Sequence, residues 1–137
     1  MADPIADILA LFSVPRAQPT TWVAATEVSL RRTGFMLCLA RNLTRVAFDL
    51  CRAGHPFVVE IADNLTITIT LRTLSATVSV VEHGLVAVTR YDGFPSVVVP
   101  DARVASQEPI GFNDDAFRMG ADRVTMDVMR RFHAAME

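Results

Sequence analysis

The stretch that decides the fold runs from Pro56 to Val99. It contains five short segments rich in β-branched residues: PFVVEI (56–61), LTITITLRT (65–73), SATVSVV (75–81), LVAVTRY (85–91) and SVVV (96–99). Within Leu65–Arg72, leucine and isoleucine alternate strictly with threonine and arginine, which predicts a strand with one buried face. The links between segments are short, and short links favour antiparallel neighbours because parallel pairs need a long crossover. The sequence therefore predicts an antiparallel meander with one apolar face and one hydroxyl-rich face.

Three helices are predicted around this meander. The first covers Ile5–Phe12 after Asp3-Pro4, a pair that suits a helix start. The second covers Asn42–Ala53, with Asn42 as its N-cap and Gly54 just after its end. The third begins after Asn113, whose side chain can cap it, and covers Ala116–Met136. Its apolar residues form one stripe: Phe117, Ala121, Val124, Val128, Phe132 and Ala135.

The region before the second helix is ambiguous. Thr20–Leu30 (TTWVAATEVSL) favours a strand by its β-branched residues and tryptophan, although its alanines and Glu27 would tolerate a helix. Arg31–Gly34 is interpreted as a polar turn, and Phe35–Ala40 (FMLCLA) as a strand buried on both faces. Pro100–Phe112 has two prolines and a glycine and is interpreted as a loop.

These elements predict a single α+β domain over residues 1–137. Its antiparallel β-meander sheet has five to seven strands, and the N-terminal, internal and C-terminal helices pack on one face. The chain is 51% hydrophobic and 20% charged, a composition typical of a folded domain.

Composition also narrows the partners and the compartment. The net charge of −2 and a polar sheet face of threonine and serine give no indication of nucleic-acid binding. No apolar run is long enough to span a membrane, and acidic residues near the N-terminus argue against a signal peptide. We therefore expect a cytoplasmic protein with Cys38 and Cys51 as reduced core thiols. All thirteen basic residues are arginine, which either a GC-rich genome or a surface for bidentate contacts would explain.

No catalytic constellation stands out. The histidines His55, His83 and His133 fall in three different elements without metal-ligand spacing, so we expect no metal and no cofactor. Glu82-His83 and Tyr91-Asp92 fall at two turns of the meander, where they either form an acid–base pair or simply fill exposed turns. We expect the protein not to be an enzyme.

The methionines of the last helix suggest a binding role. Four of them flank its apolar stripe and define a candidate interface: Met119, Met126, Met129 and Met136. Methionine adapts to irregular surfaces, so a wide Met-rich face suits a partner, whereas the alternative is a broad core face. We expect a non-enzymatic protein–protein interaction or assembly module, acting as a homo-oligomer or as a small subunit of a larger complex. The alternative is a small intracellular binding protein for an apolar, lipid-like ligand held between sheet and helices.

Two resemblances accompany this expectation, and neither assigns the chain to a family. The order of elements is similar to the profilin-like and roadblock-like layout, in which terminal helices cover a sheet. The segments PFVVEIADNLTITI and LVAVTRYDGF within Pro56–Phe94 resemble stretches of the intracellular fatty-acid-binding proteins. That family closes a ten-stranded barrel and ends in a strand carrying Arg-x-Tyr, whereas this chain is predicted to end in a helix.

Overall fold

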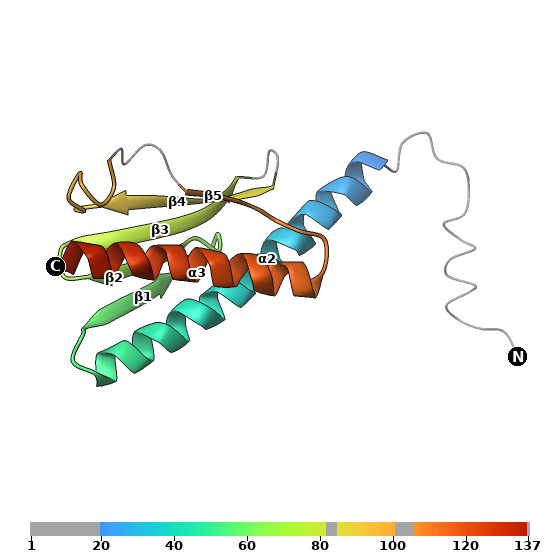
Figure 1. The fold of residues 1–137 in the computed structure, drawn as a ribbon. Coiled ribbons are helices and arrows are strands. Elements are labelled where there is room, and N and C mark those ends of the chain that lie inside the picture. Colours follow the sequence, from blue (N-terminus) through green and yellow to red (C-terminus); the bar gives the residue numbers. More distant parts are fainter. Residues whose placement is uncertain (1–19, 82–84, 101–105, 137) are drawn as a thin grey trace, which may run out of the picture.

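A five-stranded antiparallel sheet and two helices make up the part of the chain that the structure, a computed structural model, describes: residues 20–81, 85–100 and 106–136 (Figure 1). The strands follow one another in space in chain order, as in a simple meander. The elements are α2 (Thr20–Arg52), β1 (Phe57–Ile61), β2 (Ile67–Leu71), β3 (Leu74–Val81), β4 (Val86–Asp92), β5 (Ser106–Pro109) and α3 (Asp114–Met136). The α+β class and the antiparallel meander are confirmed, with five strands and two described helices.

One face of the sheet forms the core with the two helices. Ile69 pairs with Val59 and Ala76 across the ladder, and Ala76 pairs with Tyr91, so their side chains project to the same side. The alternation predicted for β2 is confirmed because Ile67, Ile69 and Leu71 are all buried. On the opposite face the hydroxyls of Thr68 and Thr77 lie 3.1 Å apart. No described helix covers that hydroxyl-rich face.

The strand and turn predictions for residues 20–40 are wrong, because Thr20–Arg52 is one continuous helix of 33 residues. The run FMLCLA is short and apolar, and such a run cannot be assigned to strand or helix by periodicity alone. Its buried members continue at helical spacing into the predicted second helix: Phe35, Met36, Leu39, Leu43 and Ala47. Asn42 therefore lies inside the helix and is not its cap. Its side-chain amide donates a hydrogen bond of 2.8 Å to Asp122 of α3.

Two glycines bring α2 and α3 into close contact. A Cβ atom built on Gly34 of α2 would lie 2.7 Å from the ring of Phe117 on α3. Reciprocally, a Cβ on Gly120 of α3 would lie 3.1 Å from the ring of Phe35 on α2. Each helix thus receives a phenylalanine of the other over a glycine, and this packing explains why glycine is present inside both helices despite its low helix propensity.

Two of the predicted helix ends are confirmed, the glycine stop at Gly54 and the cap at Asn113. After α2, Gly54 adopts a φ of 97°, its N–H donates to Cys51 O, and the N–H of His55 donates to Leu50 O. This pair of bonds is the Schellman arrangement, which a glycine in left-handed conformation allows. At the start of α3, the N–H of Ala116 donates to Asn113 Oδ1 at 2.9 Å, so the predicted asparagine cap is confirmed.

The fifth strand is not the predicted segment. Ser96–Val99 forms a turn, in which the N–H groups of Val98 and Val99 both donate to Pro95 O. The strand is Ser106–Pro109, which was predicted as loop and pairs with Val86–Thr89 of β4. Since SQEP has no β-branched residue, pairing with β4 rather than intrinsic preference makes it a strand. The helix predicted over Ile5–Phe12 lies outside the described residues.

Arg31 fastens α2 to the segment between β5 and α3. Its guanidinium donates hydrogen bonds to Ile110 O at 2.7 Å and Gly111 O at 2.9 Å. The same group lies 4.0 Å from the ring centroid of Phe112. This clasp occurs where the sequence predicted a turn, and it fixes the direction in which α3 begins.

Candidate functional site

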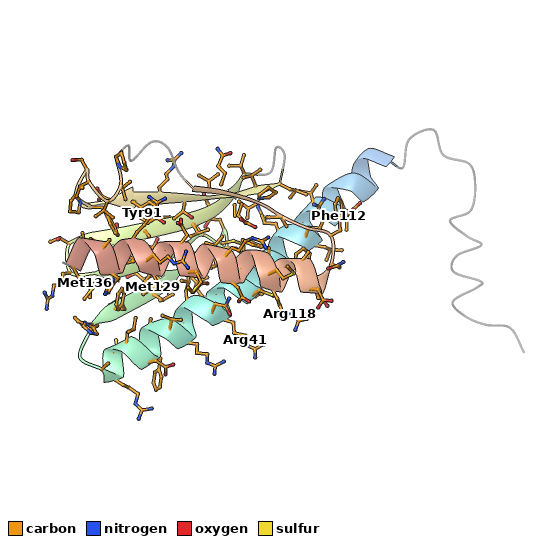
Figure 2. The ribbon with its side chains drawn as sticks, in the orientation of Figure 1. Arg41, Tyr91, Phe112, Arg118, Met129 and Met136 are labelled. Carbon is orange, nitrogen blue, oxygen red and sulfur yellow. The ribbon has the colours of Figure 1, made fainter. Side chains whose placement is uncertain are left out.

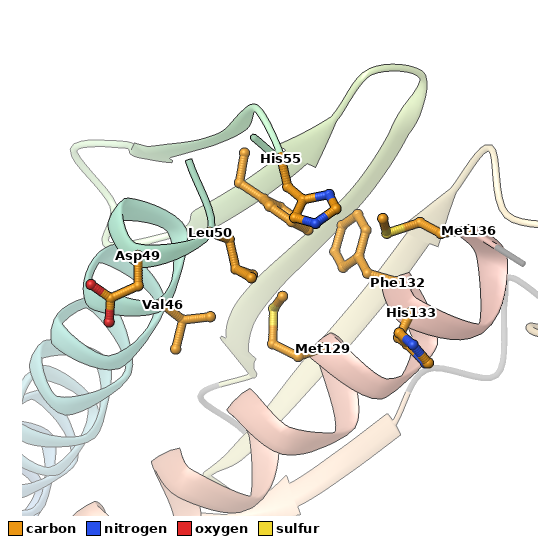
Figure 3. A pocket seen from close by; sticks show the side chains of 9 residues that line it. Val46, Asp49, Leu50, His55, Met129, Phe132, His133 and Met136 are labelled. Carbon is orange, nitrogen blue, oxygen red and sulfur yellow. The ribbon is translucent and has the colours of Figure 1, made fainter. Parts of the chain in front are cut away.

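An apolar pocket of about 600 Å³ lies between the C-terminal halves of α2 and α3 (Figure 3). Its volume falls in the range of small-molecule sites in proteins. Figure 3 shows Leu50 of α2 and Met129 of α3 pointing toward each other, with Phe132 beside them. The lining residues come from both helices and from the start of β1: Val46, Asp49, Leu50, His55, Phe57, Met129, Phe132, His133 and Met136.

The floor of this pocket is formed by aromatic rings that pack edge-on against one another. Phe132 is fully buried and packs edge-on against Phe57, with ring centroids 5.2 Å apart. It also packs edge-on against Phe94 at 4.9 Å, and Phe94 in turn packs against Tyr91 at 5.1 Å. Such edge-to-face pairs are the favoured geometry of aromatic rings. The pocket is therefore bounded by core residues on its inner side.

Polar groups at the pocket are confined to its rim. His55 is half-buried, and Asp49 and His133 are exposed. Sequence reasoning placed His55 and His133 in unrelated elements, and the structure brings both to this one pocket. Their imidazoles carry nitrogen atoms that form hydrogen bonds, whereas the inner surface offers only apolar contact.

A second apolar surface runs along the solvent side of α2. We call it the α2 seam and define it by Leu30, Leu37 and Phe48, whose exposed fractions are 67%, 58% and 62%. The spacings of 7 and 11 residues place these side chains on one line of the helix, about 150° from the buried line of Leu39 and Leu43. Side chains this exposed on a helix that also builds the core mark a surface available for contact.

The four predicted interface methionines divide into two pairs. Met119 and Met126 are exposed on the side of α3 away from the core, spaced seven residues apart. Met129 packs against the core and lines the pocket, and Met136 lies at the same pocket (Figure 2). The structure thus brings Met129 and Met136 together at the pocket and leaves Met119 and Met126 on a separate surface.

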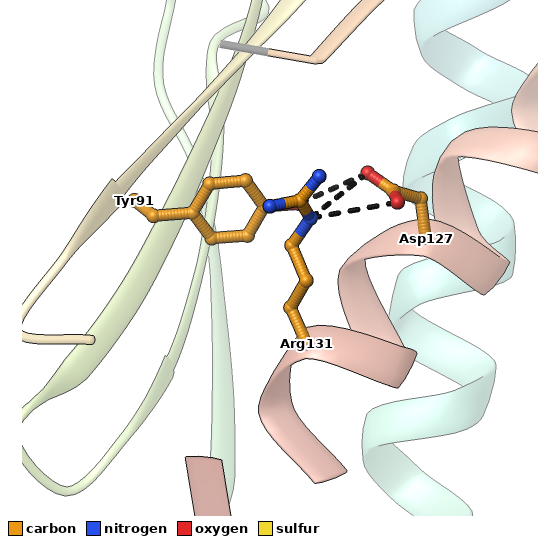
Figure 4. A network of polar contacts seen from close by, with 3 residues as sticks. All are labelled: Tyr91, Asp127 and Arg131. Atoms are coloured by element: carbon orange, nitrogen blue, oxygen red, sulfur yellow. Dashed lines mark hydrogen bonds and ion pairs between the residues drawn. The ribbon is translucent and has the colours of Figure 1, made fainter. Parts of the chain in front are cut away.

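A small polar network joins β4 to α3 (Figure 4). The hydroxyl of Tyr91 donates to Asp127 Oδ2 at 3.3 Å, and Arg131 Nε lies 3.3 Å from the same oxygen. The Arg131 guanidinium also lies 5.0 Å from the Tyr91 ring centroid. Tyr91 is buried and faces α3, so it does not simply fill an exposed turn, which was the alternative to the acid–base hypothesis. Glu82 and His83, the other half of that hypothesis, lie outside the described residues.

Beside this network, Glu108 of β5 and Arg123 of α3 form an ion pair, with Arg123 Nε donating to Glu108 Oε1 at 2.7 Å. The hydrogen bond and the charge of Glu108 raise the pKa of the Arg123 guanidinium above its ordinary value. The pair joins β5 to α3 at the surface of the molecule.

The described residues contain two cysteines and no cluster of metal-ligating side chains. Within residues 20–81, 85–100 and 106–136, no three His, Cys, Asp or Glu side chains gather as a metal site. Both cysteines are free thiols. Cys38 packs against the core as predicted, but the core assignment of Cys51 is wrong, because its side chain is exposed and Sγ donates to Phe57 O at 3.1 Å.

The α2 seam was missed because sequence reasoning divided this region into a strand, a turn, a strand and a helix. Read as one helix, the series Leu30, Leu37, Thr44 and Cys51 recurs every seven residues, and Phe48 adds one more apolar position beside it. That heptad spacing is the signal that would have identified the seam. The pocket carries no such signal, because its lining comes from segments far apart in the sequence.

Comparisons of the chain with family models, curated proteins and solved structures found no match. None of the helices in the described part of the chain is long and apolar enough to cross a membrane.

Proposed function

We propose that this domain is a non-enzymatic protein–protein interaction module that acts in assembly, as a homo-oligomer or as a small subunit of a larger complex. The observation that carries the proposal is the α2 seam. Leu30, Leu37 and Phe48 expose more than half of their side chains on one line of a helix whose other side is buried. A lone exposed leucine needs no explanation, but an aligned series of large apolar side chains is typical of helix-mediated association.

The energy available from the seam is sufficient to contribute to a stable contact. Fully burying a leucine or phenylalanine side chain stabilises by about 1.5–3 kcal/mol, so covering the exposed parts of these three contributes about 3–5 kcal/mol per subunit. Two seams meeting each other would double this contribution before the entropy lost on association is subtracted. Met119 and Met126 form a smaller apolar surface on α3, which provides a separate place to test.

Substitution of the seam provides the test. Leu37→Glu places a charge at the centre of the seam, which the isolated subunit tolerates because the position is exposed. In an interface the same charge would be buried without a partner. We expect Leu37→Glu to keep the parent's circular-dichroism melting curve and to abolish association in size exclusion with light scattering. Met126→Glu, on the exposed side of α3, is the matched control.

The outcomes separate clearly. Loss of association with Leu37→Glu alone supports the seam, and loss with Met126→Glu alone moves the interface to the predicted methionine surface of α3. A parent protein that is a monodisperse monomer at micromolar concentration, and from which pull-down recovers no partner, would contradict the assembly function.

A second function, binding of an apolar small molecule, is favoured by the pocket between α2 and α3. Its lining of Leu50, Met129, Phe132 and neighbouring apolar side chains, with polar groups only at the rim, suits an apolar ligand with a polar end. Native mass spectrometry of the purified protein should then show added mass from a carried ligand. Val46→Phe, which adds bulk at the pocket wall, should remove that mass without changing the fold. Protein without added mass that also fails to bind 1-anilinonaphthalene-8-sulfonate would contradict this function.

A further inference from the structure

The side chains along the solvent face of α2 are arranged so that a second copy of the helix fits them in one orientation. Large side chains occur in two pairs, Leu30 with Phe48 and Leu37 with Arg41. The residue numbers of each pair sum to 78, so both pairs are centred on position 39. A two-fold axis near residue 39 would therefore place each member opposite the other member of its pair. All four side chains are exposed, and Figure 2 shows Arg41 pointing away from the body of the molecule.

We infer that two copies of this chain associate by antiparallel pairing of their α2 helices along the α2 seam, an inference that rests on the proposed assembly function. Leu30 then packs against the partner's Phe48, and Phe48 packs against the partner's Leu30. Leu37 lies beside the partner's Arg41, whose aliphatic stem covers it while the guanidinium remains in water. The paired segment from residue 30 to residue 48 is about 27 Å long.

Charge complementarity supports this orientation. Glu27 and Arg52 are both exposed and lie on the same side of the seam. Their residue numbers sum to 79, so the same two-fold axis near residue 39 places them at the same height. Antiparallel pairing brings Glu27 against the partner's Arg52 at both ends of the contact. Arg52 already lies over the Phe48 ring, with its guanidinium carbon 5.9 Å from the ring centroid. The Arg52–Phe48 unit of one copy therefore faces the Glu27–Leu30 unit of the other.

Parallel pairing lacks these features. A parallel two-fold pair sets equal residues of the two copies at the same height but on opposite sides of the contact, so neither Glu27 nor Arg52 gains a partner of opposite charge. Arg41, near the centre line of the seam, would meet the partner's Arg41 at the same level of the helix, and like charges disfavour that contact. The antiparallel arrangement adds a pair of opposite charges at each end and sets Arg41 beside Leu37.

Cross-linking through the native Cys51 tests the orientation. Two Cys51 side chains are about 36 Å apart in the antiparallel pair, whereas they lie at the same height along the helices, and so much closer, in a parallel one. Position 26 lies opposite the partner's Cys51, because 26 and 51 sum to 77 and both residues are exposed on the same side of the seam. We expect Thr26→Cys in a Cys38→Ser background to form a disulfide-linked dimer under mild oxidation. The Cys38→Ser protein alone should give none.

Charge reversal independently tests the contact between Glu27 and the partner's Arg52. Glu27→Arg and Arg52→Glu should each weaken the dimer by about three- to tenfold in Kd, and the double variant should recover most of the loss. Melting curves by circular dichroism verify that each variant is folded. A covalent dimer of the Cys38→Ser protein, or no link in a Thr26→Cys protein that still dimerises, would overturn the antiparallel pairing.

The test distinguishes the failure of this inference from that of the proposed function. An oligomer that persists with Leu37→Glu and ignores both charge reversals would overturn the α2 pairing while leaving an assembly role in place. A monomer whose association with a purified protein partner depends on Leu37 would do the same. A monomer without any partner would remove both.

Discussion

The close crossing of α2 and α3 gives the sharpest stability prediction. Gly34→Ala adds a Cβ atom 2.7 Å and 2.9 Å from two ring carbons of Phe117, so the ring must shift within a packed core. Overpacking of this kind costs about 1–3 kcal/mol. Replacing a glycine inside a helix by alanine gains about 1 kcal/mol, which opposes the cost. We expect a net destabilisation of about 1 kcal/mol, a decrease in Tm of about 4 °C for a chain of this length.

Gly120→Ala is the matched control, because it makes the same change at the reciprocal position. Its Cβ would lie 3.1 Å from the Phe35 ring, a distance that requires the ring to move by only a few tenths of an ångström. The gain in helix propensity is the same, so we expect Gly120→Ala to be neutral or stabilising by up to about 1 kcal/mol.

A double-mutant cycle isolates the contact between Gly34 and Phe117. Phe117→Ala alone should cost about 3–5 kcal/mol, because its ring is buried between the helices. In the Gly34→Ala background the cost should be smaller by about 1–3 kcal/mol, since the clash is removed together with the ring. Urea denaturation monitored by circular dichroism measures all four free energies of unfolding. A Gly34→Ala protein stabilised as much as Gly120→Ala, with no coupling to Phe117→Ala, would refute the reasoning.

Three further predictions concern the sheet, the clasp and the core stripe. Ile69→Asp buries an unpaired charge in the core and should leave the domain unfolded or insoluble, whereas Thr68→Asp on the open face should give a soluble protein with a cooperative melting curve. Equal damage from both variants would mean that both faces of the sheet are covered. Arg31→Lys cannot keep both hydrogen bonds to Ile110 O and Gly111 O or the stacking on Phe112, so it should lower the free energy of unfolding in urea titrations by about 1–3 kcal/mol. An unchanged urea midpoint would show that these Arg31 contacts do not stabilise the fold. Val128→Ala removes two methyl groups from a fully buried position, so the free energy of unfolding in the same titration should fall by about 1–3 kcal/mol while the mass measured by light scattering stays the same. A loss of association would instead place this side of α3 in an interface.

The elements that could be predicted from the sequence are those whose local signals agree with their packing. Alternation in Ile67–Leu71 matches a strand covered on one face, and the Asn113 cap with the stripe through Val128 matches a helix on that sheet. The glycine at position 54 marks the end of α2 because the left-handed turn there requires it. In each case the preference of the single residue and the tertiary structure indicate the same element.

The elements that could not be predicted depend on contacts between distant segments. Gly34 resembles a turn residue until Phe117, 83 positions later, is known to pack over it. Ser106–Pro109 has no strand preference of its own and becomes a strand by pairing with β4. The pocket likewise requires His55, Leu50 and Phe132 to meet at one end of the molecule. Residue types alone do not show which distant segments come into contact.

The distance between the two copies of Cys51 tests the central claim, assembly through α2, most directly. Cys51 is exposed, so a nitroxide label can be attached to it in a Cys38→Ser protein and the label–label distance measured by double electron–electron resonance. The antiparallel pairing of α2 predicts one distance distribution centred at about 36 Å. The absence of any dipolar signal at micromolar concentration, or a distance so short that the labels touch, would contradict the account.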